Sequence, residues 1–534
     1  MRPAAAAVRL AARRGELRPR LLWAAGLALT GVALFIAYLR QSRTGPVNSD
    51  GASNALQAWD MLHGNVLLHG WYLSDVSFYT TELPEYMLVE AVRGLGPDVV
   101  HICAALTYTL LVLLAALVGR GRATGREGLV RALVAGGIMV APAITLGTRS
   151  LLSSPDHTGT GVPVLLMLLL LDRARPRWYV PAAVLAILTW VEMADQLAVY
   201  AAAAPLALVC LLRAWAGSGQ RDTPSAPRWY DAWIAAAAAA SVGLTRVAVA
   251  VIHAAGGFTV HPVPGPLLSS PSAWPAQAVL TGQCVQVLFG AENYYQHSTL
   301  SGLLAVLHAT GLALAAWALL AGIVRFFRRP DRVSQILAAG TVITLAAGIA
   351  GTHLGSLANA HEIAIVLPFG AALAGRMFPR RPVPGLRPLL AVALACYLAT
   401  LGYAATLRPA LPANEALTEW LSAHGLTDGL AGYWEANSVS LDSGLRTELS
   451  PAIATGSHRI GAYRWESDSA WYSPGAHYAN FAVIVASNVL QPAYLSDHAV
   501  RRAFGRPAHV YRLPGYTIMV WNKNLLTRLG RPSP

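Results

Sequence analysis

Long apolar runs separated by short polar segments dominate the first 407 residues of the chain. A membrane-spanning helix needs about 20 mainly apolar residues, and about eleven runs reach or approach that length. These runs are 21–39, 99–118, 129–147, 159–171, 179–192, 196–212, 231–252, 300–323, 334–351, 361–375 and 388–406. The runs at 159–171 and 179–192 are short, so they are either partial spans or buried helices. The pattern predicts a polytopic α-helical membrane protein with about 11 spans.

The positions of arginine predict how these spans are oriented. Arginines cluster before the first run and in every second loop after it. The clusters are Arg2, Arg9, Arg13, Arg14, Arg18 and Arg20; Arg120, Arg122 and Arg126; Arg173, Arg175 and Arg177; Arg213, Arg221 and Arg228; Arg325, Arg328, Arg329 and Arg332; and Arg376, Arg380, Arg381 and Arg387. Because basic loops stay on the cytoplasmic side, we expect a multi-pass protein of the plasma (cytoplasmic) membrane with its N-terminus inside. The first run lacks a small-residue cleavage site, so we expect it to remain as an anchor.

Three segments on the predicted outer side are long, namely 40–98, 253–299 and 408–534. We therefore expect a transmembrane domain over 1–407 and an extracytoplasmic domain over 408–534. In the second domain the pattern predicts helices at 413–424 and 495–504, strands near 430–436 and at 481–487, and a hairpin of 508–513 and 516–522. Pro514 and Gly515 supply the turn of that hairpin. The C-terminal region should be a small α/β domain.

Composition excludes a purely soluble enzyme, a disordered chain and a disulfide scaffold. Of the 534 residues 55% are hydrophobic and 13% are charged, whereas a soluble surface needs about a quarter charged residues. The net charge of +13 lies in clusters between apolar runs and forms no continuous basic face, so we expect no nucleic-acid partner. Four cysteines without metal-type spacing predict neither a disulfide nor a zinc site. They are Cys103, Cys210, Cys284 and Cys396.

The first outer segment has the most informative polar pattern. Its apolar positions have helical spacing, which predicts an amphipathic helix at the membrane surface. These positions are Ala52, Ala55, Leu56, Trp59 and Leu62. Asp50 lies at the N-terminus of this helix. It is either the cap of the helix or a general base held at the lipid–water boundary, and the two roles can coexist.

These residues resemble the GT-C superfamily of membrane glycosyltransferases, in particular the protein O-mannosyltransferase and lipid A aminoarabinose transferase kind. That family has an acidic residue just outside its first span, followed by a surface helix of small and apolar residues. The matching positions here are Asp50, Ala52, Ala55, Ala58, Met61, Leu62 and Gly64. Residues 81–88 stand where the family has a Lys-Pro-Pro element, and residues 360–368 are similar to its Arg-Tyr-x-Leu-Pro element.

The chain departs from the family pattern at two points. Gly51 follows Asp50 where the family usually has a second acid. Glu82 and Glu85 flank a proline where the family has a lysine that meets the lipid phosphate. Two carboxylates would repel a phosphate unless a metal or an arginine intervenes, so the donor is handled differently or the activity is lost. The nearest outer cations that could take the place of the lysine are Arg93 and Arg149.

The resemblance implies a reaction as well as a fold. A sugar on a polyprenyl phosphate would pass, with inversion, to an acceptor hydroxyl at the outer face, and Asp50 would take the acceptor proton. Cations or a metal would stabilise the lipid phosphate as it leaves. The sequence names no certain cofactor and leaves a divalent metal open. No nucleotide is needed, which fits a chain without a Gly-rich phosphate loop, and the partners would be the lipid-linked donor, the acceptor and membrane lipid.

Other outer-side residues complete the candidate site. The family often has a second acidic group or a metal-binding group in the second outer loop, where Asp156 and His157 are the catalytic candidates and a plain turn is the alternative. Glu192 and Asp195 lie at the junction of two apolar runs, where carboxylates are usually functional, with a capped turn as the alternative. The candidates for donor binding are Glu82, Glu85, Arg149, Arg246, His361 and Glu362. Snorkelling of Arg246 and a helix cap at 361–362 are the simpler interpretations.

Two other functions stay open. A transporter or flippase of a lipid-linked or polar solute would need polar groups near mid-bilayer and usually an internal repeat; we find no repeat, and the ionisable residues gather at the outer ends of spans. A catalytically inactive membrane assembly protein is kept open by the missing lysine and second acid. An enzyme predicts that Asp50, Asp156 and His361 converge on one outer cavity, open sideways to lipid.

Overall fold

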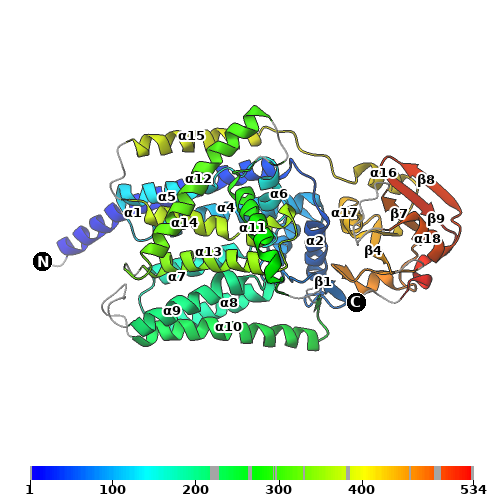
Figure 1. The fold of residues 1–534 in the computed structure, drawn as a ribbon, viewed down its shortest axis with the longest axis horizontal. Helices are drawn as coiled ribbons and strands as arrows, with labels where there is room; N and C mark the ends of the chain where they lie inside the picture. Colours follow the sequence, from blue (N-terminus) through cyan, green and yellow to red (C-terminus); the bar gives the residue numbers. More distant parts are fainter. Residues whose placement is uncertain are drawn as a thin grey trace.

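The computed structural model describes residues 3–216, 228–261, 267–292, 294, 298–328, 331–379, 385–455, 459–485 and 495–530, with side chains from Leu22 onward. It consists of a helical bundle with a six-stranded sheet at one end (Figure 1). The expected mostly helical fold with a C-terminal sheet region is confirmed. Some predicted positions lie outside the described residues: Arg2, Arg221, Arg329, Arg380, Arg381 and the last two residues of the strand expected at 481–487.

The helices of the bundle coincide with the apolar runs. They are α1 (Pro3–Ser42), α4 (Pro97–Arg120), α5 (Gly125–Met139), α7 (Gly161–Arg173), α8 (Tyr179–Ala194), η1 (Val199–Ala203) with α9 (Ala204–Ala216), α10 (Arg228–Ala254), α12 (Thr299–Val324), α13 (Arg332–Ala350), η4 (Leu357–Ile363) with α14 (Val366–Met377), and α15 (Leu386–Ala404). Six of the described helices are long and apolar enough to cross a membrane, and η4 with α14 makes a bent seventh. The run at 129–147 is shorter as a helix, because Pro142 cannot continue the helical hydrogen bonding beyond Met139.

The centre of the bundle is α14, whose residues from Val366 to Gly375 are all buried. It packs against α4, α5, α12 and α13. Small residues allow the closest of these contacts, since a Cβ on Gly375 would lie 2.6 Å from the carbonyl oxygen of Arg131 in α5 and 3.1 Å from Cα of Gly119 in α4. The run at 361–375 therefore forms a helix in the core of the bundle. Its apolar sequence alone does not distinguish such a helix from one that faces lipid.

Two outer segments differ from their predicted form. The first contains α2 (Ser49–Leu62), β1 (Trp71–Leu73) and α3 (Glu82–Arg93); α2 packs on α3 and the C-terminal region and is buried on most of its surface, so the expected surface helix is instead an interior one. The stretch 253–299, expected as a loop, contains β2 (Thr259–Val260), η3 (Pro271–Ala273) and α11 (Trp274–Phe289). Helix α11 packs on α13 and η4. A short helix, α6 (Leu146–Leu152), precedes the second outer loop.

The C-terminal region is an α/β unit. Its elements are α16 (Glu415–Ala423), β3 (Asp428–Ala431), α17 (Tyr433–Asp442), β4 (Glu448–Ala454), β5 (Ile460–Ala462), β6 (Ser467–Asp468), η5 (Ser469–Tyr472), β7 (Phe481–Val485), α18 (Asp497–Phe504), β8 (His509–Leu513), β9 (Tyr516–Val520) and η6 (Leu525–Arg528). The sheet order is β5-β4-β3-β7-β9-β8, with β3 parallel to β4 and β7. The predicted hairpin is confirmed, and Gly515 takes a φ of +85° in its turn. The strand expected near 430–436 is wrong beyond Ala431, because Gly432 is the N-cap of α17.

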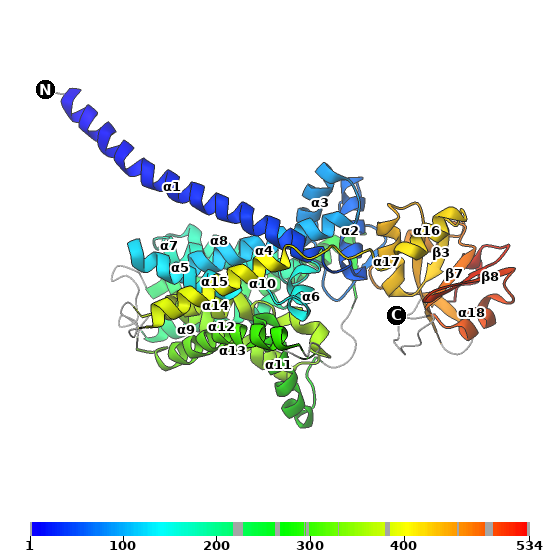
Figure 2. The same cartoon turned by 90° about the horizontal axis from the view of Figure 1, so that it is seen from above.

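A second, three-stranded sheet joins distant parts of the chain around the first outer segment. Strand β1 pairs parallel with β2 and antiparallel with β6, with Tyr72 opposite Thr259 and Ser467. Ser49 also donates a hydrogen bond of 2.6 Å to the backbone oxygen of Tyr433. Seen from above, the C-terminal end of α1, α2 and α17 follow one another toward the sheet (Figure 2). The C-terminal region is therefore attached directly to the helix that carries Asp50.

Candidate active site

Asp50 lies in the first turn of α2, but it is not the cap of that helix. Asn48 is the cap, since its side-chain oxygen accepts a hydrogen bond of 2.9 Å from the backbone N–H of Gly51. Asn48 also donates to Oδ2 of Asp50 at 3.1 Å, and the hydroxyl of Tyr433 donates to Oδ1. The capping interpretation of Asp50 is therefore wrong. Its carboxyl group instead accepts hydrogen bonds from the side chains of Asn48 and Tyr433.

Asp156 is buried in the loop between α6 and α7. Its two oxygens accept hydrogen bonds from Asn54 of α2 at 2.7 Å and from Ser154 at 2.5 Å. Burial raises the pKa of Asp156 above its ordinary value. Burial, and then the charge of Asp156, raise the pKa of Asp50 to about 6, although the hydrogen bond from Tyr433 lowers it. The charge of Asp156 therefore influences the protonation of Asp50.

His157 is paired with a carboxylate. Its Nδ1 lies 3.0 Å from Oδ2 of Asp195, which also accepts from Thr160 at 3.1 Å. Burial by itself would lower the pKa of His157, but the charge and hydrogen bond of Asp195 outweigh it and raise the pKa to about 10. His157 is therefore a cation at neutral pH. Its ring centroid lies 5.4 Å from that of His361, so these two candidates come together.

A cavity of about 770 Å³ opens beside His157 and Asp195. Its polar lining includes Asp75, Glu192, Arg246, His353 and Glu362, and its walls also contain apolar residues from α8, α10 and α13. Among the described side chains, Arg246 has no ion-pair partner. The cavity combines a charged region with an apolar wall, which suits a ligand with a charged head and an apolar tail.

The two glutamates beside Pro84 lie in different surroundings. Glu82 is fully buried, accepts a hydrogen bond from Thr81, and packs against Gly159, where a Cβ would lie 2.5 Å from its Oε1. Burial raises its pKa well above the ordinary value, which favours the neutral form. Glu85 accepts from Thr107 of α4 at 2.6 Å and lies between α3 and α4, and burial raises its pKa to about 7.

The outer arginines fall into two groups, those near the candidate site and those in a surface ion pair. Arg149 is exposed on α6, and its charge lowers the pKa of Asp50 against the larger effect of burial. Arg93 and Arg43 instead bind Asp98, at 3.4 and 2.7 Å. Of the candidate arginines, Arg149 and Arg246 therefore remain near the candidate site, while Arg93 belongs to a surface ion pair.

Three residues of the site were not found from the sequence. Asp75 follows β1 and lines the cavity. Tyr433 and Glu466 come from the C-terminal region, and both are 3% exposed. No local motif marks any of them, because their proximity to the other site residues arises only from tertiary packing. A backbone feature does mark two site residues in the structure, since His157 and Glu466 take left-handed conformations with φ of +57° and +46°.

Within the part of the chain that the structure describes, one group of side chains could hold a metal ion. It consists of Asp428, Glu448 and His477, whose ligand atoms lie within 4.8 Å of one another. Asp428 and Glu448 begin the neighbouring strands β3 and β4, and Nδ1 of His477 is 3.0 Å from Oδ1 of Asp428. This group is in the C-terminal sheet, apart from the cavity.

No family model and no curated protein matches the sequence. The fold is similar to that of ArnT from Cupriavidus metallidurans in its crystal structure bound to undecaprenyl phosphate, with a TM-score of 0.55, 12% identity, and 95% of this chain and 99% of ArnT covered. Two Archaeoglobus fulgidus structures cover 85% of this chain at 11% identity: the oligosaccharyltransferase with Zn and sulfate (TM-score 0.47, 67% of its length) and AglB with an inhibitory peptide and a dolichol-phosphate (TM-score 0.43, 69%). The expected likeness of fold to a lipid A aminoarabinose transferase is therefore confirmed for the fold alone.

Proposed function

We propose that this chain, with the fold of the GT-C membrane glycosyltransferases, moves a sugar from a polyprenyl-phosphate donor to an acceptor hydroxyl at the outer face of the membrane. The observation that carries the proposal is the electrostatic coupling of Asp50 with Asp156 and His157, together with the cavity of about 770 Å³ that His157 lines. Asp50, Asp156 and His361, which we expected to converge on one cavity, are not among the residues that line it. The shared fold with ArnT, which was solved bound to undecaprenyl phosphate, supports a lipid-phosphate donor.

Asp50 is the base in this mechanism. Its pKa of about 6 leaves it mostly ionised at pH 7 yet basic enough to accept a proton, which is the range that general-base catalysis favours. The acceptor oxygen attacks the anomeric carbon, and its proton passes to Asp50. The bond between that carbon and the phosphate oxygen breaks on the opposite face, so the configuration inverts and the electron pair leaves with the lipid phosphate.

The leaving phosphate needs positive charge near it. His157, protonated below a pKa of about 10, and Arg246 both line the cavity. Burial raises the pKa of Glu82 well above its ordinary value and so favours the neutral form, which does not repel the phosphate. The loss of the family's lysine is therefore compensated by cations from other elements. Nothing in this step requires the metal-type group of the C-terminal sheet.

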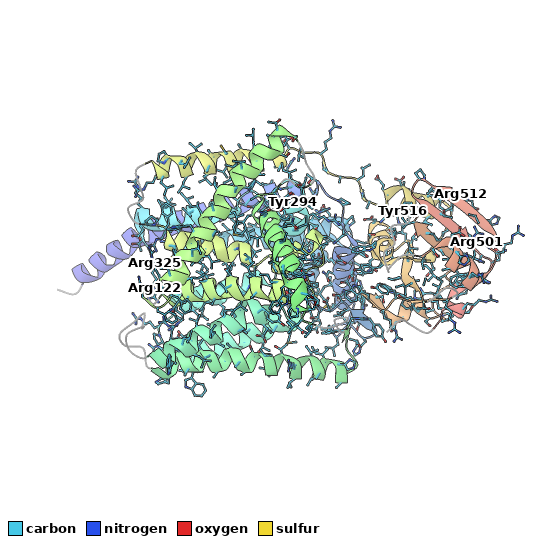
Figure 3. All side chains as sticks on the ribbon, in the orientation of Figure 1. Arg122, Tyr294, Arg325, Arg501, Arg512 and Tyr516 are labelled. Carbon is cyan, nitrogen blue, oxygen red and sulfur yellow. The ribbon has the colours of Figure 1, made fainter. Side chains whose placement is uncertain are left out.

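The membrane topology belongs to the same proposal. We place the N-terminus inside, about 11 helical segments in or across the membrane, and residues 408–534 outside as a separate domain. Arg122 and Arg325, from two of the basic loops, lie at the end of the bundle opposite the sheet (Figure 3). Most polar residues of the cavity come from loops and helix ends on the sheet side, which favours chemistry at the membrane surface over translocation through it.

A transfer assay in liposomes with radiolabelled polyprenyl-phosphate sugars tests the proposal. We expect Asp50→Asn to lower the rate by a factor of about 10² to 10⁴, the usual contribution of a general base. Asp60→Asn is the matched control, since Asp60 is on the same helix and contacts Asn65 and Trp71 instead. Unchanged transfer by Asp50→Asn would remove Asp50 as the base. Absence of transfer by the wild-type protein from every donor would contradict the proposed function.

A further inference from the structure

The hydroxyl of Tyr433 lies between two carboxyl groups. It contacts Oδ1 of Asp50 and Oε2 of Glu466. Asp50 belongs to α2, Tyr433 is the first residue of α17, and Glu466 directly precedes β6. Asp50 and Tyr433 are 383 positions apart in the chain. The three side chains thus form a chain of hydrogen bonds across the boundary between the first outer segment and the C-terminal region.

Counting hydrogens restricts how this chain can be protonated. A phenol hydroxyl has one hydrogen to donate, and an ionised carboxylate can only accept. Tyr433 therefore cannot donate to Asp50 and Glu466 at the same time. If both contacts are hydrogen bonds, one of the two carboxyl groups must be protonated and must donate to the oxygen of Tyr433. Only two arrangements remain, with the proton on Asp50 or on Glu466.

The surroundings favour Glu466 as the protonated partner. It is 3% exposed, whereas Asp50 is partly exposed and receives a second hydrogen bond from Asn48. The charged groups that act on Asp50 from other elements are Asp156, His157 and Arg149, of which two are cationic. Those that act on Glu466 are Asp50 and Asp156, which are both acidic, while Ser74 donates to it. Burial raises the pKa of Glu466 well above its ordinary value.

We propose that Glu466, acting through Tyr433, keeps Asp50 in its ionised form and so prepares it to act as a base. Glu466 carries the proton and donates to Tyr433, and Tyr433 donates to Asp50. Both are positioning residues, because they act through Asp50 and touch no reacting atom. This inference rests on the role of Asp50 in the proposed function. It gives the C-terminal region a part in catalysis, since that region sets the charge of the base.

The backbone holds Glu466 in this position at a cost. A φ of +46° is unfavourable for a residue with a Cβ, and such strain persists only where the surrounding structure imposes it. The next two residues form β6, which pairs with β1 through Ser467 and Asp468. Asn437 of α17 also donates to the backbone oxygen of Glu466 at 3.1 Å. Glu466 is therefore fixed from both the first outer segment and α17.

Three variants separate the two protonation arrangements in the transfer assay, read as the pH dependence of kcat/KM. Gln in place of Glu466 can donate from its amide to Tyr433 as a neutral acid does, so we expect Glu466→Gln to keep the wild-type acid limb and most of the activity.

Tyr433→Phe removes the donor to Asp50, so the pKa of Asp50 should rise. The acid limb should then move up by about one pH unit, which is a tenfold loss of rate at pH values below the limb. Glu466→Ala should also move the acid limb of kcat/KM to higher pH. If Glu466 is ionised instead, Glu466→Gln removes a negative charge and moves the acid limb to lower pH, which would overturn the inference.

A second measurement does not depend on activity. Difference infrared spectra of the purified protein at neutral pH should contain the C=O stretch of a protonated carboxylic acid that disappears in Glu466→Gln and remains in Asp50→Asn. A band that disappears in Asp50→Asn instead would place the proton on Asp50 and refute the inference, even if the Glu466 variants do not fold. If the Glu466 band is present but no donor is used, the protonation assignment stands and the proposed function fails.

Discussion

His157 shows how a single pair of residues can set the charge of a largely buried site. Histidine would normally lose its charge on burial, because the charged form is poorly solvated there. Asp195 reverses that effect with an ion pair of 3.0 Å, and its other oxygen accepts the backbone N–H of Leu197 at 2.8 Å. The resulting cation is rigidly placed at the wall of the cavity.

Breaking this pair should destabilise the protein in a pH-dependent way. Asp195→Asn leaves His157 buried without its anion, so we expect a loss of about 3–5 kcal/mol in the free energy of unfolding at pH 7. The pKa of His157 in the folded state is raised to about 10, above the value of about 6.5 in an unfolded chain. The stabilisation is therefore complete below about pH 6.5 and is lost as the pH rises through about 10. Thermal unfolding in detergent, followed by tryptophan fluorescence from pH 6 to 10, measures the effect.

The control for this experiment is Asp98→Asn. Asp98 forms ion pairs with Arg43 and Arg93, but its side chain is 38% exposed. Exposed ion pairs contribute at most about 1 kcal/mol, so we expect a small shift in the unfolding midpoint with little pH dependence in this range. A constant difference between wild type and Asp195→Asn from pH 6 to 10 would contradict the protonation of His157.

At the scale of elements, the packing of α14 depends on glycine. Adding a Cβ to Gly375 would bring it 2.6 Å from a backbone oxygen of α5, which cannot move without shifting the helix. We expect Gly375→Ala to destabilise the protein by about 1–3 kcal/mol, the usual cost of overpacking. Gly402→Ala in α15 is the matched control, because no atom lies within 4 Å of the added Cβ. That variant should be neutral or up to about 1 kcal/mol more stable, as helix propensity predicts. Equal unfolding midpoints for the two variants would contradict this prediction, because they would show that α14 can move away from α5 without loss of stability.

The elements also show where sequence patterns are sufficient. Every long apolar run became a helix, because a backbone in an apolar setting must satisfy its own hydrogen bonds. Helix α11 was missed, since Gln277, Gln283 and Gln286 interrupt its apolar pattern and its burial comes from η4 and α13. Strand β4 was missed because it contains Pro451. Both elements are defined by their neighbours more than by their own sequences.

The same distinction holds for the candidate site. Asp50, Asp156 and His157 could be proposed because they lie outside the predicted spans, at positions where the family that the sequence resembles has acidic or metal-binding groups. Tyr433 and Glu466 could not be predicted as site residues, because nothing in their local sequences indicates that they lie near α2. The contact of Tyr433 with Asp50 spans 383 positions of the chain. Long-range pairing of this kind is beyond any reading of periodicity or spacing.

On the scale of the whole molecule, the two ends of the bundle carry charge in different ways. At the end away from the sheet, Arg376 is 6% exposed and bridges Asp172 at 3.0 Å and Asp331 at 2.9 Å, which joins three helices. At the sheet end, Asp50, Asp156 and Glu466 share hydrogen bonds with neutral donors such as Asn54 and Tyr433. Paired charges suit a structural role, whereas carboxyl groups with raised pKa values suit proton transfer.

This asymmetry makes the membrane orientation testable with two surface positions. Arg325 and Arg512 are both exposed and lie at opposite ends of the molecule (Figure 3). In a background with the four native cysteines replaced, we expect Arg512→Cys to react with a membrane-impermeant maleimide in intact bacterial spheroplasts. Arg325→Cys should react only after the membrane is permeabilised, because positively charged loops remain cytoplasmic. The reverse pattern would invert the topology and put Asp50 on the wrong side for a lipid-linked donor used outside the cell. Labelling of both positions from one side would require an even number of crossings between them and would remove the argument that the basic loops and the sheet are separated by the bilayer.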